Sequence, residues 1–282
     1  MPNRVKLCER FSKDSPEGCH VERSRDSPRN QLEQCAGVPR LRSAPLGMTK
    51  QLFGILQVCH EIDPQSASMN MSIDEVLLET ARIPTVRFYR WRSPALSFGY
   101  FGKFSEVAMY AAERDLVRRW TGGGIVFHGD DLTYSIVIPA SDPAFAESSI
   151  AIYEKIHRAL ADALNEAGEC AVVAGGVDLG GVALARKAGV TAAGYSCFAN
   201  PVRADVMMDG RKIAGAAQRR TRRGLLQQGS IQGFDINRDL AQKFAHALSA
   251  NCSQFKINEE ILQRARELTR QKYGTESWLR MR

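Results

Sequence analysis

Short segments of the chain alternate apolar and polar residues, and this period of two predicts β-strands. These segments are rich in β-branched and aromatic residues, as is typical of pleated, half-buried strands. The predicted strands are Leu52–Cys59, Thr85–Trp91, Pro94–Phe101, Leu132–Ile138, Ala171–Ala174, Asp205–Met208, Arg211–Arg220 and Leu225–Ile231. The dipeptide Asp209-Gly210 between two of them predicts a tight hairpin turn. Gly99, inside a predicted strand, indicates a bulge or the close approach of another backbone.

Longer segments place apolar residues every three or four positions, which predicts helices with one buried face. The predicted helices are Ser66–Ala81, Phe104–Asp115, Ile150–Ala167, Leu240–Ala250 and Glu259–Tyr273. In the first of these, Ser68 is the expected N-cap, and Asp74 and Glu75 are expected on the polar side. Gly168 is well suited to end the long central helix.

Residues 1–47 have neither period and are rich in Arg, Ser and Pro. They carry nine Lys or Arg and six Asp or Glu, and so contribute +3 to the net charge of +7. Their apolar content is too low to offset the entropy of ordering, so we expect 1–47 to be disordered or a spurious extension, with Met48 as the true start. A basic interaction arm is the alternative. Residues 48–250 are expected to form the main domain, with 251–282 as a helical segment packed on it.

Composition excludes several classes of protein. No run approaches the ~18 apolar residues of a membrane span, and the charged N-terminus does not resemble a secretory signal. Seven cysteines at irregular spacings, with no CxxC pair, indicate neither a zinc site nor a disulfide framework. We therefore expect a cytoplasmic protein with free thiols. The net charge of +7 favours acidic partners and does not by itself imply nucleic acid.

Three consecutive glycines, Gly122, Gly123 and Gly124, stand between predicted strands. Because they lack Cβ atoms, a ligand can approach their main-chain N–H groups closely. Such a turn can hold the polar head of a small molecule, although an ordinary hairpin turn has the same composition. His128, which follows, could orient this turn by hydrogen bonding or act as an acid or base. Asp130 and Asp131 are expected to be turn residues.

Lys212 follows the predicted hairpin turn and is surrounded by small residues, including Gly215 and Ala216. A lysine in such a place can bind a carboxylate or phosphate or polarise a carbonyl, although most strand lysines are simply solvated. Cys197 lies in an irregular segment, where a nearby cation would lower its thiol pKa and make it an acyl acceptor; a buried, inert thiol is the alternative. The basic cluster Arg219–Arg223 could meet phosphate, an acidic partner or only solvent.

Four segments, taken in order, resemble the lipoate–protein ligase and octanoyltransferase superfamily, relatives of biotin–protein ligase. They are Ser68–Glu75, Arg87–Phe101, the Arg-Arg-x-Thr-Gly-Gly-Gly-x-Val-Phe-His stretch Arg118–His128, and the Gly-Arg-Lys-Ile-Ala-Gly-Ala-Ala-Gln-Arg-Arg stretch Gly210–Arg220. The resemblance covers roughly Leu52 to Arg282. It implies an α+β fold, a mixed β-sheet flanked by helices that is akin to class II aminoacyl-tRNA synthetases, with residues 48–250 as the catalytic domain.

The resemblance also implies a reaction. An octanoyl or lipoyl chain would pass from acyl carrier protein, through a Cys197 thioester assisted by Lys212, to a lysine of a lipoyl-acceptor domain. Acceptors in this superfamily are the glycine cleavage H protein and the E2 subunits of 2-oxoacid dehydrogenases. The expected substrate-binding residues are Arg119, Thr121, Gly122, Gly123, Gly124, His128, Gly215 and Ala216. No metal or cofactor is expected for this transferase, whereas ligases of the superfamily use ATP and Mg²⁺.

Features of the sequence favour the transferase. Cys197-Phe198 precedes the Gly-Arg-Lys motif, where cysteine-dependent transferases carry their nucleophile and ligases usually have Arg-Asn-Asp. The segment Gly129–Ser135 resembles the transferase form, and Asp239–Arg282 is too short for the accessory domain of ligases. Against this, Gly102 stands where a glutamine is common. An ATP-dependent lipoate–protein ligase, an amidotransferase using Cys197, and a non-catalytic binding protein remain alternatives, while biotin ligation is not favoured.

Overall fold

The computed structural model describes residues 51–61, 63–175, 201–233 and 239–281. The chain divides into two units, Met1–Pro45 and Leu46–Arg282, and all described residues belong to the second. The predictions made for residues 1–47 and for Cys197 therefore lie outside the described residues. The assignment of residues 48–250 and 251–282 to a domain and an appended segment stays a prediction.

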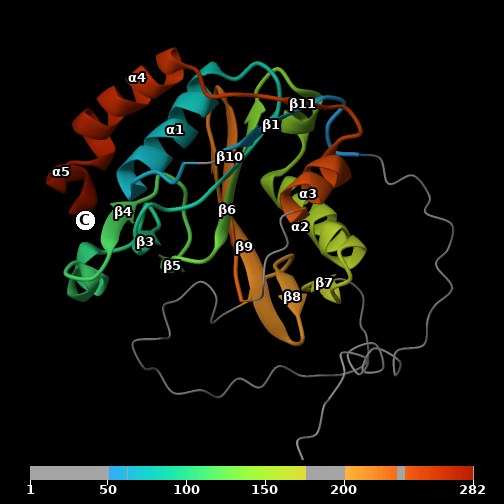
Figure 1. Ribbon diagram of the computed structural model, residues 1–282, viewed down its shortest axis with the longest axis horizontal. Coiled ribbons are helices and arrows are strands. Elements are labelled where there is room, and N and C mark those ends of the chain that lie inside the picture. The colour runs from blue at the N-terminus through green and yellow to red at the C-terminus, as the bar shows by residue number, and fades with distance from the viewer. Residues whose placement is uncertain (1–50, 62, 176–200, 234–238, 282) are drawn as a thin grey trace, which may run out of the picture. The chain divides into compact units, whose positions relative to one another are not determined.

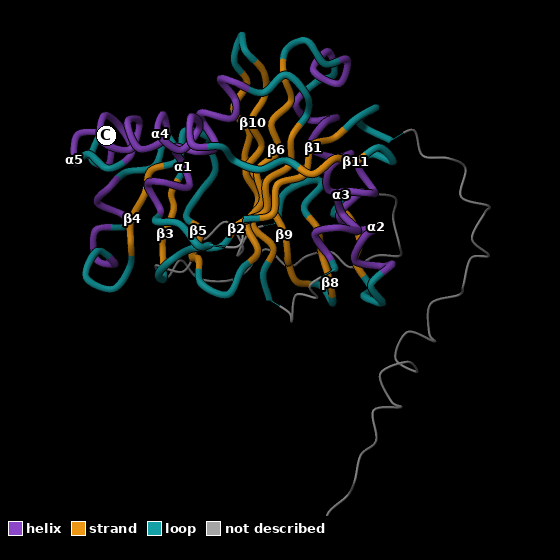
Figure 2. Tube along the Cα trace, turned by 45° about the horizontal axis from the view of Figure 1, so that its top comes forward, coloured by secondary structure: helices purple, strands orange, loops and turns teal. Residues whose placement is uncertain are grey.

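Eight of the described strands form one mixed sheet in the order β11-β1-β2-β6-β10-β9-β8-β7 (Figure 2). Strand β1 runs parallel to both β11 and β2, and the other neighbouring pairs are antiparallel. The strands are β1 (Leu56–His60), β2 (Thr85–Tyr89), β6 (Leu132–Pro139), β7 (Ala171–Val173), β8 (Val206–Met208), β9 (Arg211–Arg220), β10 (Gly224–Ile231) and β11 (Cys252–Gln254). The expected mixed sheet is confirmed.

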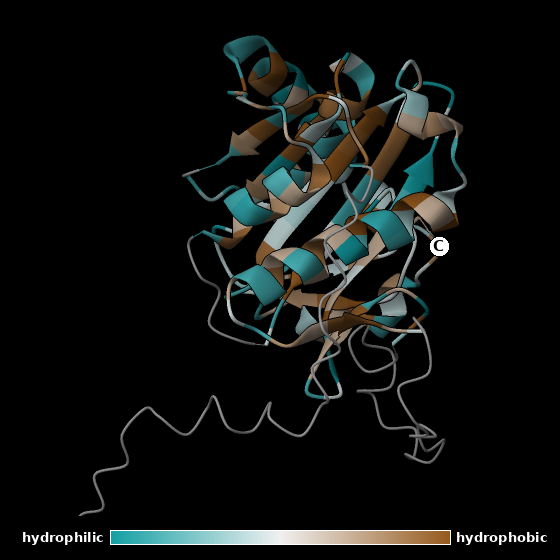
Figure 3. Ribbon diagram, turned by 90° about the vertical axis from the view of Figure 1, so that its right-hand side faces the viewer, coloured by the Kyte–Doolittle hydropathy of each residue, from teal (hydrophilic) through white to brown (hydrophobic). Residues whose placement is uncertain are grey.

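Helices cover both faces of this sheet (Figure 1). Helices α1 (Ala67–Thr80) and α4 (Glu259–Leu268) lie on one face, and α2 (Ser149–Glu166) and α3 (Leu240–Leu248) on the other. Strand β6 shows why both faces are apolar: Ile136 and Ile138 pack toward α2 and α3, while Val137 packs toward α1. On the α2 and α3 side, hydrophilic residues of the helices face outward and the strands behind are mostly hydrophobic (Figure 3).

A second, three-stranded sheet lies beside α1, in the order β4-β3-β5. It consists of β3 (Ala95–Phe98), β4 (Asp115–Arg118) and β5 (Val126–His128), with β3 parallel to β4 and antiparallel to β5. Its small core contains Leu96, Phe98, Val107 and Ile125. Strands β2 and β3, which are adjacent along the chain, therefore belong to different sheets. The triple glycine lies between β4 and β5.

The hairpin prediction is confirmed. Strands β8 and β9 pair on either side of Asp209-Gly210, whose φ angles are 49° and 73°. Two positive φ angles in succession are the signature of the tight turn that matches the twist of a hairpin. This turn sets the register of β9, and with it the position of Lys212 beside Met207.

The helix expected at Phe104–Asp115 was wrong. Two 3₁₀ turns, Phe104–Glu106 and Ala108–Tyr110, precede β4, which begins at Asp115. Asp115 pairs with Ala95 of β3, and its carboxylate accepts a hydrogen bond of 2.9 Å from the N–H of Ala67 at the start of α1. Pairing with distant residues thus overrides the local helical period at this point.

The other helix predictions hold with corrected details. Ser66, not Ser68, caps α1 by accepting a hydrogen bond from the N–H of Met69 at 3.3 Å. The C-terminal helix reaches Tyr273 as expected, but only α4 is α-helical: its last turn, Thr269–Tyr273, is π-helical, and the short α5 (Glu276–Leu279) follows. In the π turn the N–H of Gly274 reaches back to the carbonyl of Thr269 at 2.8 Å.

The placement of Asp74 and Glu75 on the polar side of α1 was also wrong, because both are buried. Asp74 accepts hydrogen bonds from Arg87 and Ser135, each at 2.7 Å, and both of these partners lie on strands. Glu75 pairs with Lys272 in the π turn. A buried carboxylate is tolerated when it is paired and hydrogen-bonded, and the partners of these two are 13 to 198 residues away along the chain.

Candidate active site

The glycine stretch is fixed to the rest of the molecule by the arginine that precedes it. The Arg118 guanidinium is fully buried and donates hydrogen bonds to the carbonyls of Tyr100 and Gly102, at 2.9 and 2.6 Å, and of Trp278 and Leu279, each at 3.0 Å. Backbone carbonyls from both the β3 side and the C-terminal segment therefore converge on one side chain. This explains how residues 278–279 stabilise a loop that lies about 160 residues earlier.

Gly99 confirms the close approach that its position in a strand predicted. A Cβ atom at Gly99 would lie 2.0 Å from the carbonyl oxygen of Gly123, a distance that no side chain can adopt. The end of β3 and the triple glycine are therefore in direct backbone contact. Thr121 adds a second fixed point, because its hydroxyl donates to the Gln228 side chain of β10 at 2.8 Å.

A chain of buried polar groups lies behind this stretch. Asp131 accepts a hydrogen bond from His128 Nδ1 at 2.8 Å, and His128 Nε2 lies 2.6 Å from the hydroxyl of Ser97. Arg119 donates to Ser97 Oγ at 2.6 Å and to the carbonyls of Gly122 and Gly124 at 3.1 and 2.8 Å. Because the Asp131 carboxylate only accepts, His128 Nδ1 carries the proton. In the neutral imidazole Nε2 is then an acceptor, and the Ser97 hydroxyl donates to it.

Burial favours the neutral form of His128 in this series of polar contacts. Burial lowers the pKa of His128, although the hydrogen bond to Asp131 acts in the opposite direction. The pKa of Asp131 is lowered by hydrogen bonds from His128 and Ser230 despite its own burial. His128 also stacks on Trp91, with ring centroids 4.0 Å apart. A neutral imidazole in these contacts links Asp131 to Ser97. Whether His128 also acts as an acid or base, the other role considered for it, stays a prediction.

Lys212 belongs to a second buried network. Its Nζ lies 2.8 Å from Asp205 Oδ2, and both side chains are buried. Asp205 also accepts hydrogen bonds from the Tyr153 hydroxyl at 2.6 Å and from the N–H of Val202 at 2.7 Å. Burial and the adjacent Asp205 carboxylate raise the pKa of Tyr153, so its hydroxyl stays protonated and donates. The same hydroxyl accepts from the N–H of Ala216 at 3.1 Å.

Gly215 is required by the path of the lysine side chain. A Cβ atom at Gly215 would lie 2.4 Å from Lys212 Cε and 2.6 Å from Nζ. The aliphatic part of Lys212 therefore lies directly across the Cα of Gly215, three residues further along β9. Any larger residue at this position would displace the ammonium group.

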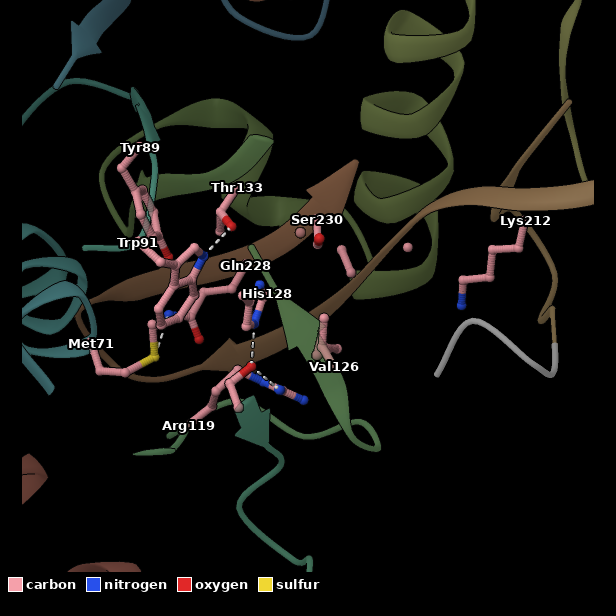
Figure 4. A pocket seen from close by; sticks show the side chains of 15 residues that line it. Met71, Tyr89, Trp91, Arg119, Val126, His128, Thr133, Lys212, Gln228 and Ser230 are labelled. Atoms are coloured by element: carbon pink, nitrogen blue, oxygen red, sulfur yellow. Dashed lines mark hydrogen bonds between the residues drawn. The ribbon is translucent and has the colours of Figure 1, made fainter. Parts of the chain in front are cut away.

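These two networks form walls of one pocket (Figure 4). The hollow encloses about 470 Å³ of space between atoms, and this volume includes the part open to solvent. Lys212 lies at one end and Met71, Tyr89 and Trp91 at the other. The lining residues are Met71, Tyr89, Trp91, Ser97, Arg119, Val126, His128, Thr133, Lys212, Gly215, Ala216, Ala217, Gln228, Gly229 and Ser230.

Comparison with known proteins identifies the family. The family model described as the lipoyl protein ligase A/B catalytic domain matches residues 66–270, most of the chain. The chain belongs to this family. The matched region contains every described residue of the pocket.

Relatives of known name lie in the same family. An octanoyltransferase LipM of Oceanobacillus iheyensis is 38% identical over 181 residues, which are 61% of this chain and 62% of the relative. The LipM of Moorella thermoacetica is 37% identical over 57% of this chain and 59% of its own length. The chain thus matches about three fifths of these two relatives. The LipM of Brevibacillus brevis is 33% identical over 70% of this chain and 72% of its own length.

Solved structures show the same fold. A T. acidophilum protein, described as a lipoate protein ligase with bound lipoic acid, aligns with a TM-score of 0.60 at 22% identity, covering 80% of this chain and 98% of that protein. A lipoate-protein ligase A bound with ATP aligns with a TM-score of 0.61, also at 22% identity and with the same coverage. At this identity the likeness concerns the fold, and it confirms the expected lipoate-ligase-like architecture.

The pocket brings together five of the residues expected to form the lipoyl ligase family site: Arg119, His128, Lys212, Gly215 and Ala216. Thr121 and the three glycines are not among the lining residues. Thr121 contacts the lining residue Gln228, and the carbonyls of Gly122 and Gly124 hold Arg119. Direct contact of the glycines with substrate stays a prediction.

The cysteine predictions are only partly open to inspection, because Cys197 lies outside the described residues. Three of the other cysteines, Cys59, Cys170 and Cys252, are described, and none of them lines the pocket. Cys59 is buried, and burial raises the pKa of its thiol to about 11, so it is protonated at neutral pH. Burial also raises the pKa of Cys252. The nucleophilic role of Cys197 stays a prediction.

Sequence reasoning missed several residues of the site. Asp131 was expected to be a turn residue, yet it is the buried partner of His128; its position three residues after a histidine was the available signal. Ser97, Asp205 and Tyr153 lacked such a signal, because their partners are 31, 7 and 52 residues away. Gln228 lies in the predicted strand Leu225–Ile231, but its hydrogen bonds to Thr121 and Asp74 depend on the fold.

The basic cluster is largely engaged within the molecule. The Arg219 guanidinium stacks over Tyr100 and Trp120, at 5.3 and 4.8 Å from the ring centroids. Arg220 donates to the carbonyls of Phe145 and Glu147.

Among the described residues, no group of three or more His, Cys, Asp or Glu could hold a metal ion. None of the helices within those residues has the length and apolar character that a bilayer crossing requires.

Proposed function

We propose that this protein transfers an octanoyl group from acyl carrier protein to a lysine of a lipoyl-acceptor domain, through a thioester on Cys197. The observation that carries the proposal is the pocket, which has a buried ammonium at one end and buried apolar side chains at the other. The octanoyltransferase relatives, at 33 to 38% identity, support it.

The pocket suits an aliphatic chain. Its polar groups already have partners: Thr133, for example, accepts from Trp91 and donates to Asp131, each at 2.8 Å. No buried side-chain nitrogen or oxygen of the described residues lacks a hydrogen-bond partner. A hydrocarbon chain would therefore break no hydrogen bond as it enters, and each buried methylene would contribute about 0.8 kcal/mol.

Lys212 would act at the carbonyl end of the chain. When a nucleophile attacks a thioester, negative charge develops on the carbonyl oxygen, and a preorganised cation stabilises it. Asp205, which is itself held by the Tyr153 hydroxyl, keeps the ammonium in one place, so little reorganisation is needed when the charge develops. The same cation would favour the thiolate form of a nearby cysteine.

The reaction then has two acyl-transfer steps. First, Cys197 loses its proton, and the thiolate attacks the carbonyl carbon of the octanoyl-carrier thioester; a new C–S bond forms, the old C–S bond breaks, and the carrier leaves as a thiolate that takes up the proton Cys197 lost. Second, the amine of the acceptor lysine attacks the Cys197 thioester; an amide C–N bond forms, and the cysteine recovers its proton. The first step exchanges one thioester for another, and neither step consumes ATP, a metal ion or another cofactor.

The proposed partners are acidic carrier and acceptor domains, the glycine cleavage H protein or an E2 subunit, which suit a chain of net charge +7. Among the structural neighbours, a bi-partite lipoate protein ligase of T. acidophilum was described together with its E2 lipoyl domain. It aligns with a TM-score of 0.58 at 20% identity. A cytoplasmic location accords with these partners.

Mass spectrometry of the intact protein after incubation with octanoyl-carrier tests the proposal. The wild-type chain should gain the mass of one octanoyl group, and Cys197→Ser should gain none. Cys170→Ser is the matched control, because Cys170 is an exposed thiol outside the pocket lining, and it should be acylated like the wild type. An adduct that persists on Cys197→Ser would refute the assignment.

The same preparation separates the alternatives. A lipoate–protein ligase would require ATP and Mg²⁺ and would use free lipoate or octanoate. An amidotransferase would accept the chain from one acylated acceptor domain and pass it to another. Acylation of an acceptor domain by octanoyl-carrier without ATP supports the transferase, and modification only when ATP and free acid are present would replace it with the ligase.

A further inference from the structure

The pocket has two chemically different ends, and they give a bound acyl chain a direction (Figure 4). On the function proposed above, the carbonyl lies at the Lys212 end, where the cation can stabilise its oxygen. The methyl end of the chain then points toward Met71, Tyr89 and Trp91, which are all buried. These three side chains form the closed end of the pocket.

Two of the three are fixed by hydrogen bonds. The Tyr89 hydroxyl donates to Asp74 at 3.1 Å, and the Trp91 Nε1–H donates to Thr133 at 2.8 Å. The Trp91 ring is also stacked on His128. Moving either ring would leave buried polar groups without partners, which is costly, so these residues form a rigid part of the closed end.

Met71 is held in a different way. Its thioether sulfur lies 3.3 Å from the Gln228 amide nitrogen, and that amide is itself fixed by Asp74 at 2.7 Å. Sulfur is a weak acceptor, and an unbranched methionine has several rotatable bonds, so its tip adjusts at low cost. Met71 is therefore the adaptable side chain at the closed end.

The geometry points to Met71 as the residue that sets the longest acyl chain the pocket accepts. The substrate class is an unbranched, saturated, medium-length acyl thioester without a polar group at its methyl end. A hydroxyl or carboxyl there would be buried among groups that are already paired with each other. Met71 limits length because each further methylene must displace its side chain.

Substitutions at Met71 should change chain-length selectivity in opposite directions. Met71→Ala removes Cγ, Sδ and Cε and frees the length of about three methylenes. Discrimination in an apolar pocket is on the order of tenfold or more for each methylene. The ratio of kcat/KM for decanoyl- or dodecanoyl-carrier to that for octanoyl-carrier should therefore rise at least tenfold in Met71→Ala. In Met71→Phe, the ratio of hexanoyl to octanoyl should rise instead.

Two controls separate selectivity from loss of stability. Met69→Ala changes the same residue type in the same helix, but the Met69 sulfur contacts Thr269, outside the pocket, so its length profile should match the wild type. Met71→Leu keeps most of the buried volume and should retain the preference for octanoyl. Unchanged ratios in both Met71→Ala and Met71→Phe would overturn the inference, because each ratio is internal to one variant and independent of how much protein is folded.

A binding measurement keeps this result separate from the proposed function. Native mass spectrometry or calorimetry with the free hexanoic, octanoic, decanoic and dodecanoic acids reports occupancy without any transfer. If the length preference for binding shifts in Met71→Ala while no chain is transferred from the carrier, the inference stands and the transferase proposal fails. If transfer proceeds and the length profile does not move, the inference fails alone.

Discussion

Two buried aspartates, Asp131 and Asp205, belong to the two networks that line the pocket, and each is connected to a cation. Asp205 contacts the Lys212 ammonium directly, at 2.8 Å. Asp131 reaches the Arg119 guanidinium only through His128 and Ser97, a neutral imidazole and a hydroxyl. In both arrangements the buried polar groups have hydrogen-bond partners, but only Asp205 contacts its cation directly.

The difference shows how one cavity can be both reactive and apolar. The Lys212 ammonium remains compact and lies in the pocket lining, where a carbonyl oxygen would need it. The Arg119 guanidinium donates hydrogen bonds to Ser97 and to the carbonyls of Gly122 and Gly124, so it is held in place by several neutral acceptors. On the proposed function, the direct pair would serve the chemistry and the indirect series of contacts would position the site.

The largest expected effect concerns the direct pair. Lys212→Met removes the cation with little change in length and should reduce octanoyl transfer on the order of 10³-fold, since one preorganised group that stabilises an oxyanion has this value. Kinetics with octanoyl-carrier measure the loss. Because Asp205 would be left buried without its cation, the double variant Lys212→Met with Asp205→Asn is the control; it should recover stability without activity. Wild-type rates in either variant would contradict the assignment.

The next effect concerns the position of the ammonium. Gly215→Ala places a methyl group where Lys212 Cε lies and should displace Nζ by roughly 1 Å, which lowers the transfer rate up to about 10²-fold. Thermal unfolding should change little, because the displaced group is the end of a flexible side chain. Gly54→Ala, at a glycine with open space around it, should leave the rate unchanged. Equal rates for the two variants would disprove this account of Gly215.

A moderate effect is expected for the indirect chain. Ser97→Ala disconnects His128 from Arg119 and leaves His128 Nε2 without its donor, which should cost about 1–3 kcal/mol of unfolding free energy. Transfer should fall less than in Lys212→Met, because no charged group is removed. Urea unfolding and kcat/KM measure both. Ser72→Ala is the control: this buried serine is hydrogen-bonded to Ser68 and Thr269, and the variant should lose stability without the kinetic change. The same kinetic change in both variants would show that the hydrogen bonds from Asp131 to Arg119 do not position the site.

The smallest effect is a gradual loss of stability in weak acid. Burial lowers the pKa of His128, and that of His157 to about 4, so both bind fewer protons in the folded than in the unfolded chain. Their contribution is complete above the unfolded pKa of about 6.5 and is lost as the pH falls toward the folded values. From pH 7 to pH 6, His157 alone accounts for about 0.7 kcal/mol. Urea unfolding of the wild type and His157→Gln checks this: the variant should depend less on pH, and an equal or steeper dependence would contradict it.

Much of the fold could be predicted from local patterns. The strands, the Asp209-Gly210 turn and the long helix α2 follow from periods of two and 3.6 and from turn chemistry, which act within about ten residues. The Phe104–Asp115 helix failed where strand pairing competed with a local period, and the burial of Asp74 and Glu75 was missed because their partners lie on other elements.

The sequence by itself determined the family, the mixed sheet, and the presence of Lys212, Arg119 and His128 as candidates. Only the tertiary structure decided that Asp131 holds a neutral histidine, that Asp205 holds the lysine, and that Met71 closes the pocket. The physical reason is that burial and contact depend on how the elements pack. A motif records which residues are present, but it does not show that His128 and Asp131, or Asp205 and Lys212, are buried against each other, although each pair lies close along the chain. Contacts such as that of Glu75 with Lys272, 197 positions apart, depend entirely on which strands and helices pack together.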